Sequence, residues 1–461
     1  MARTRIIATL GPSSRDERTL EKMILEGVTV FRLNFAHGTL EEKVEEISLI
    51  KKVAGRLGVP VATMVDVRGP EIRTVMGRKA LKIEAGDIVT VSGPDGVGEI
   101  KIEPANVLSK VGKGDYIFIS GGKIQLEVLD VKPDLVRCEV VFGGIVTDKR
   151  GVNIPNVDME VEGLTERDKK ALKVAVGQGV DFVALSFIKT RENVDEAVKF
   201  LKSISENPPS VIAKIETRAA VRNIKEIIES AYGVMVARGD LGVEIPLNEV
   251  PIVQKEIIRK CNEAAKPVIT ATEMLESMIS NPRPTRAEVS DVFNAILDGT
   301  DAVMLSEETA AGRYPVLSVR WMRKISEEAE KFLRPRLDLP IDSIPSVVSK
   351  AAVQASIDLN AKAIVCDTFT GFTARNISRH RPKAYIVAVP SSETVVRRLM
   401  LTWGVDPVLL PGEHEQEKVL RKAMEYLRAR RLISKGDRVL FSAGLPFGHK
   451  KTNMFRVVEV E

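Results

Sequence analysis

The sequence of 461 residues contains few cysteines, histidines or aromatic residues and no long apolar run. Cys138, Cys261 and Cys366 lie far apart without metal-ligand spacing, which argues against a disulfide framework and for a reducing, cytoplasmic compartment. Four histidines and no serine–histidine–acid pattern argue against a covalent hydrolase. Aromatic residues make up only 5% and basic residues alternate with acidic ones, so no nucleic-acid partner is expected. No apolar stretch could span a bilayer and no signal peptide precedes the first strand pattern, so no membrane partner is expected.

The composition that remains is that of a soluble globular protein, with 44% hydrophobic and 28% charged residues. A length of 461 residues exceeds one compact core and predicts two or three domains. The net charge of +5 is a mild bias that suits small anionic substrates.

Strand-like apolar runs alternate with amphipathic helical patterns along most of the chain. In the segment 39–56, for example, Leu40, Val44, Ile47 and Ile50 fall on one helical face. Eight alternating units favour a closed, parallel (β/α)₈ TIM barrel within an α/β fold. The eight expected strands are 5–10, 28–35, 59–67, 182–187, 211–216, 233–238, 267–272 and 302–306.

Far more sequence separates the third and fourth expected strands than any other pair. The extra segment has short β-like pieces at 88–91, 116–119 and 136–141, broken by glycine-containing turns, which predicts a small all-β domain. An insertion in this loop lies at the catalytic end of a barrel, where it can act as a lid. A third region follows, with strand-like runs at 363–366, 385–389 and 439–442. We therefore expect a barrel domain of 1–69 and 154–335, an inserted β lid of 70–153, and a C-terminal α/β regulatory domain of 336–461.

Two short charged strings end neighbouring strands of the expected barrel. Lys214 and Glu216 are two residues apart, as are Arg238 and Asp240, so each pair should share one face of its strand. Two carboxylates and two cations at one sheet edge suit a divalent metal, with Glu216 and Asp240 as its ligands, that holds a phosphorylated anion. The alternative is two surface salt bridges at strand ends.

The other strand ends are also polar, as expected of a phosphoryl-transfer site. Arg32 adds positive charge, and Thr272 and Ser306 add hydroxyl groups. For Arg32, a buried salt bridge to Asp66 is an alternative role, and Thr272 could cap the helix that follows it.

Six motifs, in order along essentially the whole chain, resemble the pyruvate kinase family. They are Thr9-Leu10-Gly11-Pro12-Ser13-Ser14, Arg32-Leu33-Asn34-Phe35-Ala36-His37-Gly38, Gly69-Pro70-Glu71-Ile72-Arg73-Thr74, Lys214-Ile215-Glu216, Ala237-Arg238-Gly239-Asp240-Leu241-Gly242 and Ala271-Thr272-Glu273-Met274-Leu275-Glu276-Ser277-Met278. The resemblance implies a phosphotransferase that converts phosphoenolpyruvate and ADP into pyruvate and ATP, the final step of glycolysis. A Mg²⁺-dependent aldolase or lyase on a related barrel is the alternative.

The resemblance also implies roles for the strand-end residues. Glu216 and Asp240 would ligate Mg²⁺ or Mn²⁺, and Lys214 would neutralise the phosphoryl group in flight and the enolate left behind. Arg32 would contact the phosphoryl group. The backbone amides of Gly239 and Asp240, with the Thr272 hydroxyl, would hold the substrate carboxylate. Thr272 and Ser306 would belong to the proton path, so the implied catalytic set is Lys214, Arg32, Thr272 and Ser306.

Nucleotide contacts are implied for Asn34, Arg73 and Arg150, with the adjacent Lys149 as the alternative to Arg150. A monovalent-cation site is implied by Asn34, Asp66 and the carbonyl of Val67. The family uses a serine where this chain has Ala36, and Val67 resembles the potassium-independent branch. Glu71 fits the potassium-requiring one, so a requirement for K⁺ stays open at this point.

The loop 368–373 of the C-terminal region resembles one that binds an effector phosphate in regulated family members. Its small hydroxyl residues and glycine, Thr368, Thr370, Gly371 and Thr373, lie before a helix, where backbone N–H groups favour phosphate. The alternative is an ordinary N-capped turn. Allosteric control by a phosphorylated effector and a homotetrameric assembly are expected from the family.

Overall fold

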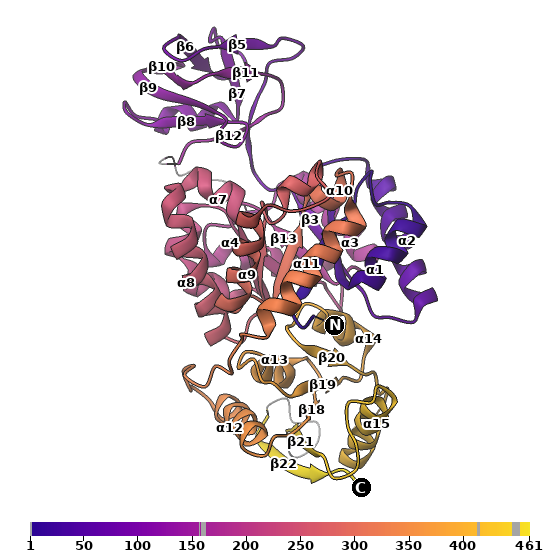
Figure 1. Ribbon diagram of the computed structural model, residues 1–461. Helices are drawn as coiled ribbons and strands as arrows, with labels where there is room; N and C mark the ends of the chain where they lie inside the picture. Colours follow the sequence, from indigo (N-terminus) through magenta and orange to yellow (C-terminus); the bar gives the residue numbers. More distant parts are fainter. Residues whose placement is uncertain (1, 156, 158–162, 413–414, 445–451) are drawn as a thin grey trace.

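The computed structural model describes residues 2–155, 157, 163–412, 415–444 and 452–461. The chain forms three units in a row, with a barrel in the middle, a small β unit at one end and an α/β unit at the other (Figure 1). The N-terminus lies near the junction of the barrel and the α/β unit. The two outer units therefore contact opposite ends of the barrel.

Eight parallel strands of the described chain close into the central barrel, in the order β1-β17-β16-β15-β14-β13-β3-β2. This confirms the predicted TIM-barrel fold class. The expected strand at 59–67 begins only at Ala62, because Val59 and Pro60 lie in the preceding exposed turn. The strands are β1 (Arg5–Thr9), β2 (Val28–Asn34), β3 (Ala62–Val67), β13 (Phe182–Leu185), β14 (Ser210–Ile215), β15 (Gly233–Ala237), β16 (Val268–Ala271) and β17 (Ala302–Leu305).

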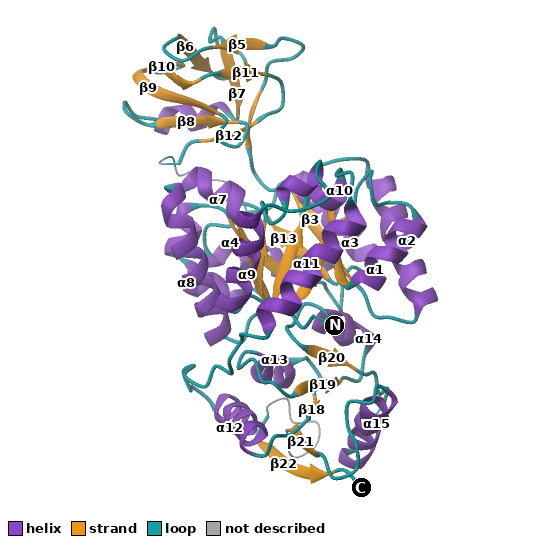
Figure 2. Ribbon diagram, viewed as in Figure 1, coloured by secondary structure: helices purple, strands orange, loops and turns teal. Residues whose placement is uncertain are grey.

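Helices surround these strands, as Figure 2 shows. The expected helix 39–56 is α2, which begins after Thr39 and ends before Gly58. The α-helices of the barrel unit are α1 (Glu17–Glu26), α2 (Leu40–Leu57), α3 (Glu166–Gly177), α4 (Arg191–Ile204), α5 (Arg218–Arg222), α6 (Ile224–Ser230), α7 (Arg238–Glu244), α8 (Val250–Glu263), α9 (Arg286–Asp298), α10 (Glu307–Ala310) and α11 (Pro315–Glu330). Two 3₁₀ turns are η2 (Leu247–Glu249) and η3 (Glu276–Ile279).

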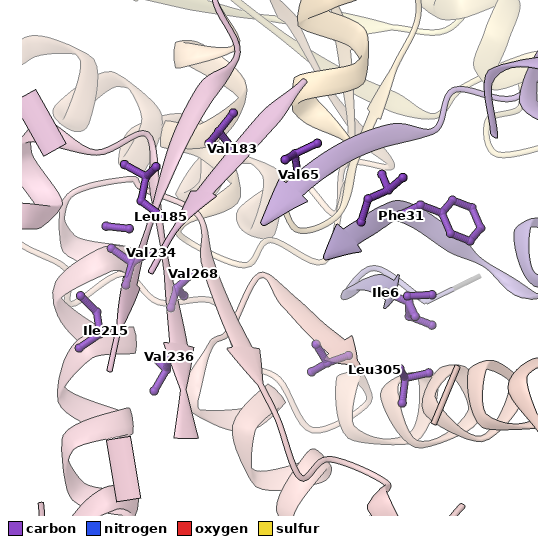
Figure 3. Packing of buried hydrophobic residues seen from close by; sticks show 14 of the residues in the cluster. Ile6, Phe31, Val65, Val183, Leu185, Ile215, Val234, Val236, Val268 and Leu305 are labelled. Carbon is purple, nitrogen blue, oxygen red and sulfur yellow. The ribbon is translucent and has the colours of Figure 1, made fainter. Parts of the chain in front are cut away.

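The barrel strands are buried on both faces, which explains why they read as continuous apolar runs. Ile6, Phe31 and Val65 belong to the core cluster between the strands and the helices (Figure 3). Ile7 and Met64 belong to a separate cluster, formed by the alternate residues that fill the barrel interior. Because neighbouring side chains alternate between these two apolar layers, the charged residues of the strands lie close to the strand ends.

The inserted segment forms the predicted all-β unit. Its main sheet is a second closed barrel of order β10-β6-β7-β4-β12-β8-β9, and β5 pairs with β11. A separate apolar core, including Val91, Ile117 and Leu126, fills this unit. Its elements are β4 (Ile72–Thr74), β5 (Leu81–Ile83), β6 (Ile88–Ser92), β7 (Ile100–Glu103), η1 (Ala105–Lys110), β8 (Tyr116–Ile119), β9 (Ile124–Lys132), β10 (Leu135–Phe142), β11 (Gly144–Val146) and β12 (Gly151–Asn153).

The C-terminal unit is a five-stranded sheet, β20-β19-β18-β21-β22, between helices, with only β22 antiparallel. The three strands predicted in this region correspond to β18, β19 and β21. Its elements are α12 (Ile344–Asp358), β18 (Ala363–Asp367), α13 (Phe372–Ser378), β19 (Tyr385–Val389), α14 (Glu393–Leu399), β20 (Val405–Pro407), α15 (Gln416–Ala429), β21 (Arg438–Ala443) and β22 (Met454–Glu459). Within the residues described, the helices are all too short or too polar to cross a bilayer.

Candidate active site

Lys214 and Glu216 lie side by side at the end of β14. The Lys214 Nζ is 2.8 Å from the Glu216 Oε1, and both side chains are buried. Ile215, between them, packs into the outer core instead. The predicted common face is confirmed, and the alternative of a surface salt bridge is wrong for this pair because water has almost no access to it.

Asp66, at the end of β3, joins this lysine to Arg32 on β2. The Lys214 Nζ lies 3.3 Å from the Asp66 Oδ1, and the Arg32 Nε and Nη2 each lie 2.8 Å from the Asp66 Oδ2. Arg32 also donates to the Thr9 Oγ1 at 3.0 Å, and Lys214 to the Ser186 Oγ at 2.7 Å. The salt bridge considered for Arg32 is therefore present, and it fixes this guanidinium beside Lys214.

These contacts determine the charge of the cluster. Burial by itself raises the pKa of Asp66, but Lys214 and Arg32 outweigh burial and hold that pKa below its usual range. Burial likewise lowers the pKa of Lys214, but Asp66 and Glu216 outweigh it and raise the pKa above its ordinary value. The site therefore keeps an ionised lysine and an ionised aspartate out of water.

Glu216 and Asp240 are the carboxylates expected to bind metal. Burial raises the pKa of Glu216 to about 7, with Lys214 opposing the rise and Asp240 adding to it. Burial also raises the pKa of Asp240, at the start of α7. The Glu216 Oε2 accepts from the Phe187 backbone N–H at 2.7 Å. A buried Glu216 whose ionised form is disfavoured by the neighbouring, more exposed Asp240 fits a divalent cation bound between two carboxylates through hard oxygens.

Arg238 departs from the prediction that it shares a strand face with Asp240. Strand β15 ends at Ala237 and α7 begins at Arg238, so the two residues are helical and point in different directions. The Arg238 Nη1 lies 2.6 Å from the Asp291 Oδ2. The four charges therefore do not converge: Arg238 turns away from Lys214 because a helix replaces the last strand residue.

Thr272 lies just beyond β16 and contacts the start of α7. Its Oγ1 accepts from the Gly239 N–H at 2.8 Å. The residue preceding the next helical turn, η3, is Leu275, so the alternative of Thr272 as a helix cap is wrong. The structure thus brings Thr272 together with Gly239 and Asp240, the three residues expected at the substrate carboxylate.

Ser306, at the end of β17, has a buried hydroxyl with no hydrogen-bond partner among the described residues. Glu308 holds its backbone, because the Glu308 Oε2 accepts from the Ser306 N–H at 2.7 Å and the Oε1 accepts from the Leu275 N–H at 3.0 Å. Glu308 was no candidate from the sequence, where nothing distinguishes it from the adjacent Glu307. Its bridging role depends on the proximity of two strand ends.

The residues expected at the nucleotide lie on the lid root and on β2. Arg73 donates to the Glu71 Oε2 at 2.9 and 2.6 Å and to the Lys149 carbonyl at 2.7 Å. Burial raises the pKa of Glu71. Arg150 immediately precedes β12, which pairs with β4, and its Nε donates to the Thr147 Oγ1 at 2.8 Å. Asn34, at the end of β2, accepts from the Ala36 N–H at 2.9 Å.

All three oxygens proposed for a monovalent cation already accept hydrogen bonds. The Asn34 Oδ1 takes the Ala36 N–H, Asp66 takes Arg32 and Lys214, and the Val67 carbonyl takes the Ser186 hydroxyl at 2.9 Å. Binding K⁺ there would share or displace these donors.

The candidate effector loop leads from β18 into α13. Gly371 occupies the N-cap position in the left-handed region, φ +79°, and no side chain caps the helix. The alternative of an ordinary N-capped turn therefore stays open, with Gly371 as the N-cap residue. The Thr373 Oγ1 is 2.7 Å from the Thr452 Oγ1, while Thr370 is exposed.

A parallel barrel with a buried lysine, an arginine and two carboxylates gathered near its strand ends has the features of a metal-dependent phosphotransferase. The family model "Pyruvate kinase, barrel domain" matches residues 1–319, and "Pyruvate kinase, alpha/beta domain" matches residues 346–458. The chain therefore belongs to the pyruvate kinase family.

Individual relatives match this chain over nearly its whole length. Pyruvate kinases of Staphylococcus saprophyticus and Staphylococcus aureus strain USA300 are each 42% identical over 99% of this chain and 80% of their own lengths. A crystal structure of a pyruvate kinase from Cryptosporidium parvum superposes with a TM-score of 0.94 at 33% identity, covering 100% of this chain and 96% of that one.

Proposed function

We propose that this protein transfers the phosphoryl group of phosphoenolpyruvate to ADP, giving ATP and, after protonation of the enolate, pyruvate. The observation that carries the proposal is the buried Lys214, held 2.8 Å from Glu216 and 3.3 Å from Asp66. A fixed, desolvated ammonium stabilises negative charge that develops on a phosphoryl group and on an enolate oxygen, because it needs no reorganisation during the reaction.

The proposal assigns each strand end one task. Glu216 and Asp240 would hold Mg²⁺ or Mn²⁺, which when bound supplies positive charge to the phosphate and carboxylate oxygens. Arg32 would contact the phosphoryl group, and the Gly239 and Asp240 amides with Thr272 would orient the carboxylate. Thr272 and the unpartnered hydroxyl of Ser306 would carry the proton to the enolate.

The nucleotide would lie between the barrel and the lid, on Asn34, Arg73 and Arg150. Arg73 lies on β4 and Arg150 immediately precedes β12, its partner strand at the lid root, so lid movement would carry both arginines toward or away from the barrel. Assays with Mg²⁺ alone and with added K⁺ test the second metal site of Asn34, Asp66 and Val67.

A coupled assay of ADP-dependent pyruvate formation tests the function. We expect Lys214→Met to lower kcat roughly 100- to 1,000-fold, as for loss of a central electrostatic group. Lys202→Met is the matched control, because Lys202 is exposed on α4. An active K214M enzyme would contradict the mechanism, and an inactive wild type would contradict the proposed reaction.

We also propose a phosphorylated effector at Thr368, Thr370, Gly371 and Thr373. No side chain that the structure describes caps the first turn of α13, and Thr370 is exposed beside it; both observations support this assignment. A panel of sugar phosphates and AMP should shift the substrate saturation curve, and Thr370→Val should weaken that shift. A curve that no member of the panel moves would exclude the effector.

We further propose a cytoplasmic homotetramer whose units divide at 1–69 with 154–335, 70–153 and 336–461. Three buried free thiols suit a reducing compartment. Exposed apolar side chains on α12, Ile344 and Val347, offer a surface for a second copy. Sedimentation equilibrium tests the assembly. The variant I344E/V347E should disrupt it, and Leu25→Glu is the control for replacing an exposed apolar side chain. Limited proteolysis tests the domain boundaries.

A further inference from the structure

The turn after β16 contains two consecutive non-glycine residues in the left-handed region. Thr272 has φ +68° and Glu273 has φ +52°. A β-branched residue rarely adopts this conformation, since its Cβ substituents crowd the backbone, and such strain persists only where the surroundings enforce it. Something in the fold must therefore hold this turn.

Arg238 makes the contacts that can do so. Its Nη2 donates to the carbonyls of Thr272 at 2.7 Å and Glu273 at 3.1 Å, and its Nε donates to the Thr272 carbonyl at 3.2 Å. The guanidinium is itself oriented by Asp291, 2.6 Å from Nη1, and by the Gln254 Oε1 at 3.4 Å. Arg238 is only 8% exposed, so its guanidinium makes these bonds with little competition from water.

The same arginine directly precedes Gly239 and Asp240 in the chain. Its side chain therefore binds the Thr272–Glu273 turn, and its backbone continues directly into Gly239 and Asp240. These two segments together form the corner expected to bind the substrate carboxylate. The left-handed conformation places the Thr272 Oγ1 2.8 Å from the Gly239 N–H. A Thr272 residue relaxed to an ordinary φ would move its hydroxyl away from this amide.

The chain beyond the turn is anchored separately. Glu308 accepts the Leu275 N–H, and Met274 and Leu275 are fully buried. Loss of the Arg238 contacts would therefore free Thr272 and Glu273 without releasing the segment that follows.

We infer that Arg238 is a positioning residue of the active site: it holds Thr272 and Glu273 in the left-handed turn and so sets the Thr272 hydroxyl against the Gly239 amide. The inference rests on the proposed function, which places the substrate carboxylate at this corner. Arg238 acts through Thr272 and does not itself reach the reacting phosphoryl group.

The test uses Arg238→Lys, which keeps the charge but cannot bridge two carbonyls and Asp291 at once. We expect kcat to fall roughly 100-fold, the scale of a misplaced catalytic group. Introducing Glu273→Gly into R238K should then raise kcat roughly fivefold, because glycine adopts the left-handed region without the penalty of other residues. Glu273→Ala in the same background is the matched control and should raise nothing, and the single variants E273G and E273A serve as references.

Equal rescue by glycine and alanine, or an R238K enzyme with wild-type kcat, would overturn the inference. If R238K does not fold, Asp291→Asn carries the same test, because it loosens the guanidinium while leaving Arg238 in place. An inactive wild type would contradict the proposed function and not this inference. Crystal structures of the wild type and R238K would then still decide the inference, through the φ of Thr272.

Discussion

Buried single residues of this protein owe their charge state to the charged groups packed around them. Lys214 stays protonated although it is buried, since Asp66 and Glu216 accompany it. His380 shows the opposite outcome: burial lowers its pKa to about 4, and Arg379, Lys350 and Arg381 oppose its charged form further, against the bond to the Arg336 carbonyl. A buried base with a counter-charge thus has a raised pKa, whereas a buried base without one has a lowered pKa.

The low pKa of His380 therefore predicts that acid destabilises the junction of the barrel and the α/β unit. Above pH 6.5 the imidazole is neutral in both states; below it the unfolded chain binds a proton that the folded chain excludes until about pH 4. The free energy of unfolding should fall across this window, by at most about 3 kcal/mol from this group. Urea titrations followed by tryptophan fluorescence would measure the fall.

The matched variants for that titration are His380→Asn and His37→Asn. His380→Asn should flatten the dependence between pH 6.5 and 4, whereas His37, which is exposed, should leave it unchanged when replaced. Identical slopes for wild type and H380N would show that another group is responsible.

At the scale of the element, the predicted helix 39–56 agrees with α2 to within one residue at each end, and local capping fixes where it begins. Helix α2 begins with a complete capping box: the Thr39 Oγ1 accepts the Glu42 N–H at 3.2 Å, and the Glu42 Oε2 accepts the Thr39 N–H at 2.9 Å. The end of β15 could not be predicted from the sequence. Strand 233–238 was expected, but no residue from Val234 to Asp240 indicates that a helix begins at Arg238.

Thr39→Ala should destabilise α2 by about 1 kcal/mol. For a barrel of this size that corresponds to a fall in Tm of roughly 2–4 °C. Thr39→Ser, which retains the hydroxyl, should stay close to wild type in a calorimetric scan. Equal losses for both variants would point to the threonine methyl group and not to the cap.

At the scale of the whole molecule, three arginines join the α/β unit to the barrel, and two of them, Arg5 and Arg381, are buried. Arg381 lies 3.2 Å from Asp301, which immediately precedes β17, and Arg397 lies 2.8 Å from Asp181, which precedes β13. Arg5 donates to the carbonyl of Thr402 at 2.8 Å. These contacts fall on the barrel end opposite to the active site (Figure 1).

Arg381→Met should cost about 3–5 kcal/mol of stability, because it leaves Asp301 buried without its cation. The double variant R381M/D301N should lose clearly less, since no uncompensated charge remains. Denaturant titration of both proteins measures the difference. A double variant as unstable as R381M would mean that packing of the arginine, and not charge, stabilises the junction.

The sequence by itself determined the fold class, the insertion, most strand positions and the pairing of Lys214 with Glu216, because hydrophobic period and strand alternation are local properties. Tertiary structure alone decided that Arg238 turns away to Asp291, that Glu308 links two strand ends, and that Thr272 is held in a left-handed turn. These depend on residues from different strands meeting around a closed barrel. Such distances follow from chain closure and packing, which no local pattern encodes.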